Sequence, residues 1–332
     1  MLAGWRAKSV LNLLRHSAAA VIAAIVLIGP EGCHRRPARV ALLTPTTGVI
    51  IWDAVHTGAV LEGRECGVAV HYDGPPREDD LRTQLAQFEQ ASESHFQVVA
   101  IAPIQMQAFR NPVERATQKG TPVIVIGDDL GIRNSNIAYV FSDDHLAGKL
   151  AADKVAELLH GAGSVAVLGI DFGQPSSLAR EQSFERALTS RYKDIHVVER
   201  KNGTTNLFQE QQTAADLLSE SIHVDAIVAL SASATRGAFY ALKAKYAHPP
   251  LHLVGFDQDL VVPLIDHEMD AVIGLRATDI GQTVARLACD RINGKKWDGP
   301  YVLSPVVLTP ETYPATDVER QLHGGGWWKG EE

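Results

Sequence analysis

From residue 40 onwards, short apolar runs alternate regularly with longer amphipathic stretches. The short runs are rich in β-branched residues and mostly apolar on both faces, which is typical of strands buried inside a sheet. The stretches between them have the length and periodicity of helices. Buried strands separated by helices predict parallel sheets that are covered by helices on both sides.

The alternation forms two successive series. The first series of predicted strands is "VALLT", "VAVHYD", "VVAIAP", "PVIVIG" and "IAYVFSD", with helices near residues 51–65, 78–94, 105–119 and 145–160. The second is "SVAVLGID", "IHVVER", "DAIVALS", "LHLVGFD" and "AVIGLR", with helices near residues 176–190, 207–220, 235–246 and 279–292. A chain of 332 residues is too long for one hydrophobic core. We therefore expect an α/β protein with two doubly wound parallel-sheet lobes.

Composition and local motifs exclude several classes of function. The formal net charge is -8, and no Lys/Arg run occurs after residue 40, so a nucleic-acid partner is not expected. The 13 His residues lack the spacing of metal ligands. The one glycine-rich candidate, "HGAGSVAV", precedes a predicted strand and so cannot place a dinucleotide phosphate on a helix N-terminus. We expect no cofactor and no metal, and nothing in the sequence favours an enzyme.

The first 33 residues have the pattern of an export signal. Basic residues precede the apolar run "SAAAVIAAIVLI", which is too short to span a bilayer comfortably, and "GPEGC" follows it. Cys33 therefore resembles the lipidation site of bacterial lipoproteins, although Pro30 and Glu31 are unusual there. An uncleaved helix is the alternative. We expect a periplasmic or extracytoplasmic protein that is anchored to the membrane if Cys33 is lipidated.

Two further features lie outside this pattern. Cys66 and Cys289 occur in helix-like contexts without CxxC spacing. Buried free thiols are therefore favoured over a disulfide, which two distant positions cannot establish. Residues 313–332, which end in "GGGWWKGEE", show no periodicity and are expected to form a disordered tail.

Polar residues gather where the predicted strands end. In "LHLVGFDQDL" a buried run stops at Gly255 and is followed by Asp257 and Asp259. Other strand ends carry "TPTTGVIIW", "GDD", "GIDFGQPSS" and "SASAT". Ligands of open parallel sheets bind at the carboxyl ends of the strands, because loops and helix N-termini meet there. These segments therefore predict one ligand-binding cleft between the lobes.

Four longer segments resemble a known family in order and spacing. They are "FSDDHLAGKLAADKVAELL", "SSLAREQSFERAL", "LVGFDQD" and "VIGLRATDIGQTVA". The chain from about residue 39 to 311 is similar to the ribose-type periplasmic sugar-binding proteins, a type I periplasmic binding protein fold shared with the ligand domains of lactose-repressor-type regulators.

The resemblance implies two lobes joined by three crossovers, near Ser142, Leu275 and Ser304. The N-terminal lobe would comprise residues 38–142 plus 276–303, and the C-terminal lobe residues 143–275 plus 304–312. A sugar or polyol would enter the open cleft and stabilise a closed form that an ABC permease recognises. We expect the protein to act as a monomer.

The resemblance also implies roles for individual residues. Trp52 falls where the family stacks an aromatic ring on the sugar, and a core tryptophan is the alternative. Arg180 falls on a ligand arginine, with an exposed helix residue as the alternative. Asp257 falls on a ligand aspartate, with a helix cap as the alternative. Asp128 or Asp129 would supply another acid.

Other positions depart from the family. Ser231 stands where the family has an asparagine. Leu275 stands where the family has a glutamine, and Arg276 lies beside it. Ala102 and Thr205 are further departures, and they predict a smaller pocket with fewer amides. Trp52, Arg180 and Asp257 alone would give too little free energy for micromolar binding, so further contacts are expected from residues such as Asp171, Gln174, Ser231 or Arg276.

These observations favour an exported, non-enzymatic solute-binding protein for a sugar or polyol that serves an ABC importer. The alternative is a ligand sensor that signals to a membrane receptor or sensor kinase. A DNA-binding repressor is disfavoured, because the segment before residue 40 leaves no room for a helix-turn-helix after the apolar run.

Overall fold

The structure is a computed structural model that describes residues 38–245 and 251–313. These residues belong to one compact unit that begins at Ala38. The expected export signal with Cys33, and all of the expected tail after residue 313, lie outside the described residues.

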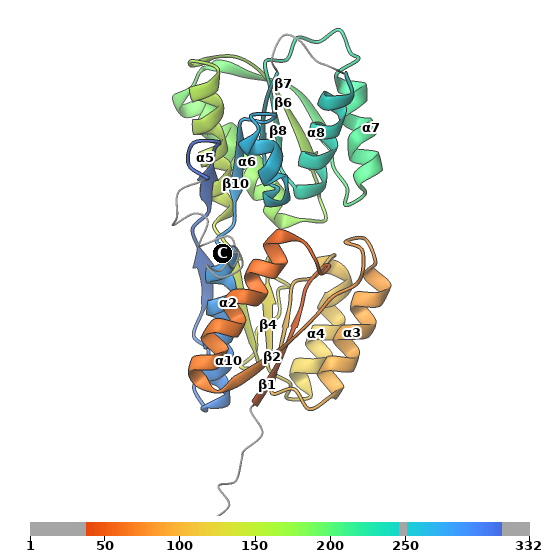
Figure 1. The fold of residues 1–332 in the computed structure, drawn as a ribbon, viewed down its shortest axis with the longest axis vertical. Coiled ribbons are helices and arrows are strands. Elements are labelled where there is room, and N and C mark those ends of the chain that lie inside the picture. The colour runs from red at the N-terminus through yellow and green to blue at the C-terminus, as the bar shows by residue number, and fades with distance from the viewer. Residues whose placement is uncertain (1–37, 246–250, 314–332) are drawn as a thin grey trace, which may run out of the picture. The chain divides into compact units, whose positions relative to one another are not determined.

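The first sheet has six strands in the order β11-β5-β4-β3-β1-β2, and all of its pairings are parallel (Figure 1). Its strands are β1 (Ala38–Leu43), β2 (Val68–Asp73), β3 (Val98–Ile101), β4 (Val123–Ile126), β5 (Ile137–Ser142) and β11 (Pro300–Leu303). Its helices are α2 (Ile50–Cys66), α3 (Leu81–Glu93), α4 (Met106–Gln118) and α10 (Ala277–Ile292). We call this sheet and its helices the N-terminal lobe.

The second sheet has the same design, in the order β12-β10-β9-β8-β6-β7. Its strands are β6 (Ala162–Ile170), β7 (Asp194–Asn202), β8 (Ala226–Ala229), β9 (His252–Gly255), β10 (Ala271–Gly274) and β12 (Val306–Leu308). Its helices are α5 (Asp144–Leu158), α6 (Pro175–Arg191), α7 (Leu207–Leu217), α8 (Ala232–Lys245), the 3₁₀ helix η1 (Gln258–Leu260) and α9 (Val261–Ile265). We call these elements the C-terminal lobe.

The chain passes between the sheets three times. It leaves the first sheet after β5, returns after β10, and crosses again between β11 and β12. Strand β12 pairs antiparallel with β10, which makes it the exception in an otherwise parallel sheet. The predicted fold class, two doubly wound lobes joined by three crossovers, is confirmed, whereas the residue boundaries assigned to each lobe stay a prediction.

Each sheet is covered on both faces, as its fully buried strands require. In the N-terminal lobe, α2 and α10 share one buried cluster with the sheet, and α3 and α4 share another. In the C-terminal lobe, α7 and α8 cover one face, and α5 and α6 cover the other. This leaves the carboxyl ends of the strands free to carry loops.

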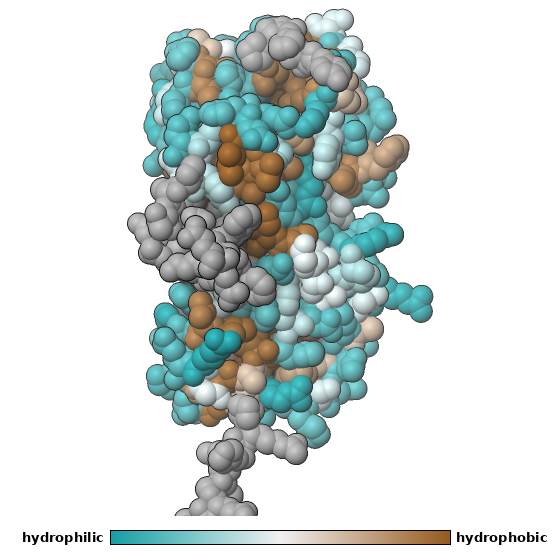
Figure 2. Space-filling view, viewed as in Figure 1, coloured by the Kyte–Doolittle hydropathy of each residue, from teal (hydrophilic) through white to brown (hydrophobic). Residues whose placement is uncertain are grey.

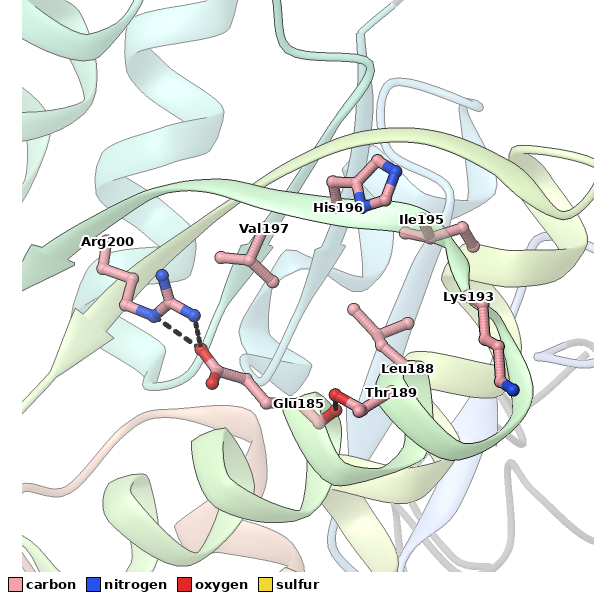
Figure 3. Close-up of a pocket in the computed structure, with 8 residues that line it drawn as sticks. All are labelled: Glu185, Leu188, Thr189, Lys193, Ile195, His196, Val197 and Arg200. Atoms are coloured by element: carbon pink, nitrogen blue, oxygen red, sulfur yellow. Dashed lines mark hydrogen bonds and ion pairs between the residues drawn. The ribbon is translucent and has the colours of Figure 1, made fainter.

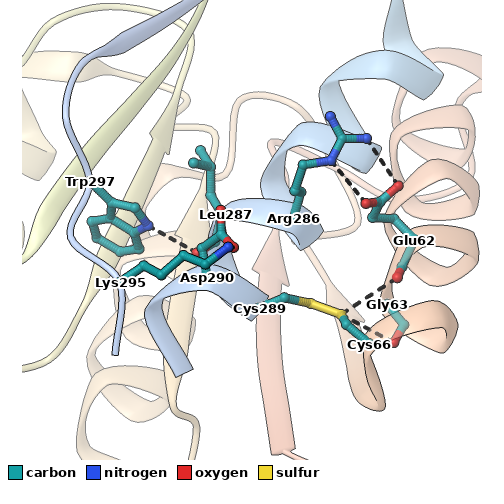
Figure 4. The surroundings of a disulfide bond; sticks show 9 residues. All are labelled: Glu62, Gly63, Cys66, Arg286, Leu287, Cys289, Asp290, Lys295 and Trp297. Carbon is teal, nitrogen blue, oxygen red and sulfur yellow. Dashed lines mark hydrogen bonds and ion pairs between the residues drawn. A yellow bond between two sulfur atoms is a disulfide. The ribbon is translucent and has the colours of Figure 1, made fainter. Parts of the chain in front are cut away.

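The expectation of free thiols is wrong, because Cys66 and Cys289 form a disulfide between α2 and α10 (Figure 4). These helices approach closely where glycines face the neighbouring backbone. A Cβ at Gly58 would lie 2.2 Å from the carbonyl oxygen of Thr278, and one at Gly281 would lie 1.9 Å from that of Val55. The close crossing brings two cysteines together that are 223 residues apart in sequence.

The described residues include no helix that is long and apolar enough to cross a membrane. Within the same ranges, no group of three or more His, Cys, Asp or Glu side chains is arranged to hold a metal ion. On the face shown in Figure 2, hydrophilic residues predominate and hydrophobic residues form small groups among them. Phe172 and Phe208 are the most exposed large hydrophobic side chains described, at 75% each.

Candidate functional site

A cavity of about 280 Å³ is lined by residues of both lobes. Its lining comes mainly from loops that follow β1, β3, β6, β8 and β9, and from the first turn of α2. Ligand pockets of this volume lie at the small end of the range that proteins use, which suits a compact solute. We call it the cleft cavity.

The cleft cavity brings together four of the six predicted site residues. Trp52, Arg180, Ser231 and Asp257 all line it. Asp171, Gln174 and Thr205, which the sequence had raised as further candidates or departures, line it as well.

The other two predicted residues are not among the lining residues. Asp128 follows β4, and its charge interacts with those of Asp144 and Arg180. Arg276 precedes α10 and lies 3.8 Å from Asp279 on the same helix, while its neighbour Leu275 lines the cavity. The geometry therefore places Asp128 near Asp144 and Arg180 and gives Arg276 a local ion pair.

Trp52 lies in the first turn of α2 and is partly buried. It packs against the buried cluster of the N-terminal lobe while it also lines the cleft cavity. Its position fits both a core tryptophan and a ligand-stacking tryptophan, because the residue packs against the core and also lines the cavity. A ring held in this way is a rigid surface for the C–H groups of a ligand.

Arg180 is held within the C-terminal lobe by three contacts. Its Nε donates to Asp144 Oδ1 at 2.7 Å, and its Nη1 donates to the carbonyl oxygen of Leu230 at 2.8 Å. Its guanidinium lies over the ring of Phe256, 4.6 Å from the ring centroid. This planar cation is therefore stacked and paired before any ligand arrives.

Asp257 lies two residues after the end of β9 and is 2% exposed. Its carboxylate accepts a hydrogen bond from the backbone N–H of Asp259 at 3.0 Å, so it caps η1 as the alternative reading supposed. It also accepts from Nε and Nη2 of Arg236, a residue of α8. Asp257 is therefore a buried, paired carboxylate at the wall of the cleft cavity.

Arg236 is the centre of a larger ionic group, which we call the Arg236 group. Besides Asp257, its Nη2 donates to Asp259 at 3.2 Å. Its Nη1 and Nη2 donate to the two carboxylate oxygens of Glu78, at 3.1 and 3.3 Å. Glu78 lies between β2 and α3 and lines the cavity together with Arg236.

Burial changes the titration of these acids. Burial raises the pKa of Asp259 to about 6, and the charge of Asp257 adds to the rise, while Arg236 opposes it. Burial also raises the pKa of Asp257, against the opposing effect of Arg236. Burial lowers the pKa of Arg236, but Asp257 and Glu78 more than offset this, so the guanidinium stays charged.

The same effect operates beside Arg180. Burial raises the pKa of Asp128 to about 6, and the charge of Asp144 adds to the rise. The hydroxyl and backbone N–H of Ser176, together with Arg180, act in the opposite direction. Both arginines therefore lie near carboxylates that are ionised less readily than in water: Asp257 and Asp259 beside Arg236, and Asp128 beside Arg180.

Glu78 and Arg236 were missed from the sequence. Arg236 lies in the first turns of α8, directly after the polar segment "SASAT" that was expected at a strand end, so its place in the chain was a usable signal. Glu78 gave no such signal, because it lies in a loop before a helix and its partner is 158 residues away.

A second hollow, of about 610 Å³, lies between α6 and β7 (Figure 3). Its lining comes from the later part of α6 and from β7 as far as Arg200, and it shares no residue with the cleft cavity. Arg200 is paired with Glu185 at 2.5 Å, and the figure shows these two side chains facing each other across its lower edge. Arg200 and Glu185 already satisfy each other's charge, and this hollow is lined by the C-terminal lobe alone. The cleft cavity is therefore the stronger candidate site.

Two covered α/β lobes, three crossovers and a cavity lined from both lobes define a two-lobed binding protein. A family profile described as "Periplasmic binding protein domain" matches residues 40–303. The chain therefore belongs to the periplasmic binding protein family, as the resemblance predicted.

Two curated relatives are binding proteins whose names refer to D-allose and ribose. The chain is 23% identical over 262 residues to the D-allose-binding periplasmic protein of Escherichia coli (strain K12), covering 76% of this chain and 84% of that protein. It is 26% identical over 222 residues to the ribose import binding protein RbsB of Haemophilus influenzae, covering 66% and 74%.

Solved structures agree on the fold. A carbohydrate transporter solute binding protein from Agrobacterium radiobacter, in complex with D-arabinose, superposes with a TM-score of 0.76 at 19% identity, covering 87% of this chain and 99% of that one. A solute binding protein of an ABC transporter from Agrobacterium vitis, bound with alpha-D-tagatopyranose, gives a TM-score of 0.77 at 19% identity, covering 86% and 99%.

Proposed function

We propose that this protein captures a sugar or polyol in the cleft cavity and presents it to an ABC importer, without catalysing a reaction. The observation that carries the proposal is a compact cavity lined from both lobes by aromatic rings and by charged and polar side chains. Its curated relatives are named for D-allose binding and ribose import. The membership of the chain in their family makes the same kind of cargo the first expectation.

The lining fits a ligand with both C–H faces and hydroxyl groups. Trp52, Leu230 and Phe256 supply apolar surface. Asp171, Gln174 and Ser231 supply acceptors and donors from loops after β6 and β8. Sugars and polyols offer small apolar faces flanked by hydroxyl groups, which this mixture of ring and polar atoms can bind.

The proposed location is the periplasm or another extracytoplasmic space. The first 33 residues have the pattern of an export signal, and lipidation of Cys33 would anchor the protein there. The Cys66–Cys289 disulfide supports this location, since such bonds persist in oxidising compartments. We propose that the protein acts there as a monomer.

Thermal unfolding with a panel of solutes tests the proposal. The panel contains D-allose, D-ribose, D-arabinose, D-tagatose and common polyols. A ligand present at 100 times its Kd stabilises the folded protein by about 2.7 kcal/mol, so the Tm should rise by about 5 °C or more. The variant Trp52→Ala should reduce the rise, and Trp52→Phe should keep most of it. A flat response across sugars and polyols would reject this function.

A further inference from the structure

The Arg236 group joins parts of the chain that belong to different lobes. Arg236 lies on α8, and Asp257 and Asp259 follow β9, so these three residues belong to the C-terminal lobe. Glu78 lies between β2 and α3, in the N-terminal lobe. Among the ion pairs of residues 38–245 and 251–313, the contact between Arg236 and Glu78 is the one that connects the lobes.

The geometry of the guanidinium separates these partners. Its Nε is used by Asp257, whereas Nη1 donates to Glu78. Nη2 is shared between Glu78 and the two acids of the C-terminal lobe. Because the guanidinium is planar and rigid, a shift of one side moves the donors on the other. Through Arg236, the position of Asp257 at the cavity wall is thus linked to the contact with Glu78 of the other lobe.

We propose that Arg236 and Glu78 form an interlobe latch in which Arg236 is a positioning residue: it holds Asp257 at the cavity wall and, through Glu78, holds the closed arrangement of the lobes. This inference rests on the proposed function, since closing matters only if the cavity takes a ligand. The latch forms when the lobes approach and opens when they separate.

The burial of the pair suits this role. The side chain of Arg236 is 19% exposed and that of Glu78 is 34% exposed, so the contact is partly shielded from water. A charge pair in such a setting is stronger than one on the open surface, yet salt still weakens it. A second contact between the lobes, from Gln174 Nε2 to the carbonyl oxygen of Ile104, is long at 3.3 Å and carries no net charge. The charges of Asp128 and Arg180 also interact between the lobes, but these two described residues form no ion pair with each other, so the latch is the ion pair that links the lobes.

Glu78→Gln removes the charge of the latch and keeps the size of the side chain. The matched control is Glu89→Gln, because Glu89 belongs to α3 of the same lobe and is paired with Arg115 at 3.6 Å within that lobe. Both glutamates lie outside the buried core, so the two variants should retain the fold and a similar Tm.

Stopped-flow measurement uses whichever panel sugar raises the Tm most. Loss of the latch should raise the dissociation rate about 5- to 10-fold, because the latch holds the lobes closed over the bound ligand. It should not lower the association rate, because the latch also closes part of the ligand-free protein. The dissociation rate of the parent protein should rise with NaCl, and that of Glu78→Gln should not. Glu89→Gln should behave like the parent. Equal dissociation rates for the two variants would overturn the latch.

Small-angle scattering of the ligand-free protein gives an independent readout. At low salt the parent and Glu89→Gln should show a smaller radius of gyration than Glu78→Gln, and 1 M NaCl should remove the difference. Identical radii for all three proteins at low salt would overturn the latch. If no panel solute binds but the radii differ as expected, the proposed function fails while the latch stands.

Discussion

Arg180 and Arg236 line the same cavity, but they are held in different ways. Arg180 forms its ion pair with Asp144 of its own lobe and lies on Phe256, also of its own lobe. Arg236 divides its donors between two acids of its own lobe and Glu78 of the other. The comparison separates two uses of the same side chain: one arginine is a fixed part of the wall, and the other connects the wall to the opposite lobe.

The difference also appears in how many carboxylates surround each cation. Arg180 has one paired carboxylate, Asp144, with the charge of Asp128 nearby. Arg236 has three carboxylates within ion-pair distance. Removing one acid should therefore leave Arg180 without its ion pair but leave Arg236 with two. The loss of stability in each case depends on whether the burial of the acid or the number of remaining partners matters more.

Alanine in place of Asp257 or Asp144 sets these two factors against each other. Asp257→Ala should lower the free energy of unfolding by about 3 kcal/mol, because it removes a fully buried partner and the cap of η1. Asp144→Ala should cost about 2 kcal/mol, because Arg180 keeps its bond to Leu230 and its contact with Phe256. Urea denaturation of both variants measures the two losses.

The variant that loses more unfolding free energy shows whether burial or the number of remaining partners matters more. A larger loss for Asp144→Ala would mean that the number of remaining partners outweighs burial. Ligand affinity should fall more for Asp257→Ala than the change in stability alone explains, if Asp257 also contacts the ligand. Titration of the variants at a temperature where both are folded separates the two effects.

Lysine in place of each arginine is the next most sensitive comparison. Lysine keeps the charge but lacks the planar fork, so Arg180→Lys should lose the stacking on Phe256 and weaken ligand binding about 10-fold. Arg236→Lys can contact fewer of its three acids at once, and we expect a similar loss of affinity.

The two variants should differ in their response to salt. Binding by Arg180→Lys should keep the salt dependence of the parent protein, because the ion pair between Arg236 and Glu78 is intact. Binding by Arg236→Lys should show a weaker salt dependence. Isothermal titration at 20 mM and 500 mM NaCl measures this salt dependence of affinity. The same salt dependence in both variants would mean that the two arginines do not have different roles.

Most of the fold was predictable because the strands are short, buried and separated by helices of ordinary length. The predicted strand at residues 68–73 agrees with β2, and the predicted helix at 207–220 overlaps α7, which ends at Leu217. The two strands after residue 299 were missed. Strand β11 is partly exposed, and only two residues separate it from β12, so neither run has the apolar pattern and flanking helices that marked the others.

The disulfide and the Arg236 group show what sequence patterns omit. Whether Cys66 meets Cys289 depends on the crossing of α2 and α10, which glycines on both helices permit. The contact of Glu78 with Arg236 depends on how two lobes approach. Trp52, Arg180 and Asp257 were predicted because a family resemblance supplied their positions. Contacts between distant loops have no such local signature.

The smallest expected effect is a pH dependence that involves one acid from each group. Burial raises the pKa of both Asp128 and Asp259 to about 6, above the value of about 4 for an aspartate in water. The folded protein therefore binds protons more tightly than the unfolded chain at these sites. Their stabilising contribution is complete below pH 4 and is lost as the pH rises through 6.

Asparagine at each position should remove this contribution. Asp128 faces Asp144, Arg180 and Ser176, and Asp259 faces Asp257, Arg236, Glu78 and the backbone of Ile51. From pH 7.5 to pH 5, the parent protein should gain about 1 kcal/mol of unfolding free energy per site relative to Asp128→Asn or Asp259→Asn.

Denaturation at both pH values measures the gain, with Asp129→Asn as the control. The pKa of Asp129 is lowered by its hydrogen bond with Arg133, so this residue stays ionised over the whole interval. Its variant should therefore show the same change between pH 7.5 and pH 5 as the parent. A pH response that is lost in Asp259→Asn but kept in Asp128→Asn would mean that Asp259, and not Asp128, takes up the proton. Such a result would assign the pH response to Asp259 and the charges around it, which are those of Asp257, Arg236 and Glu78.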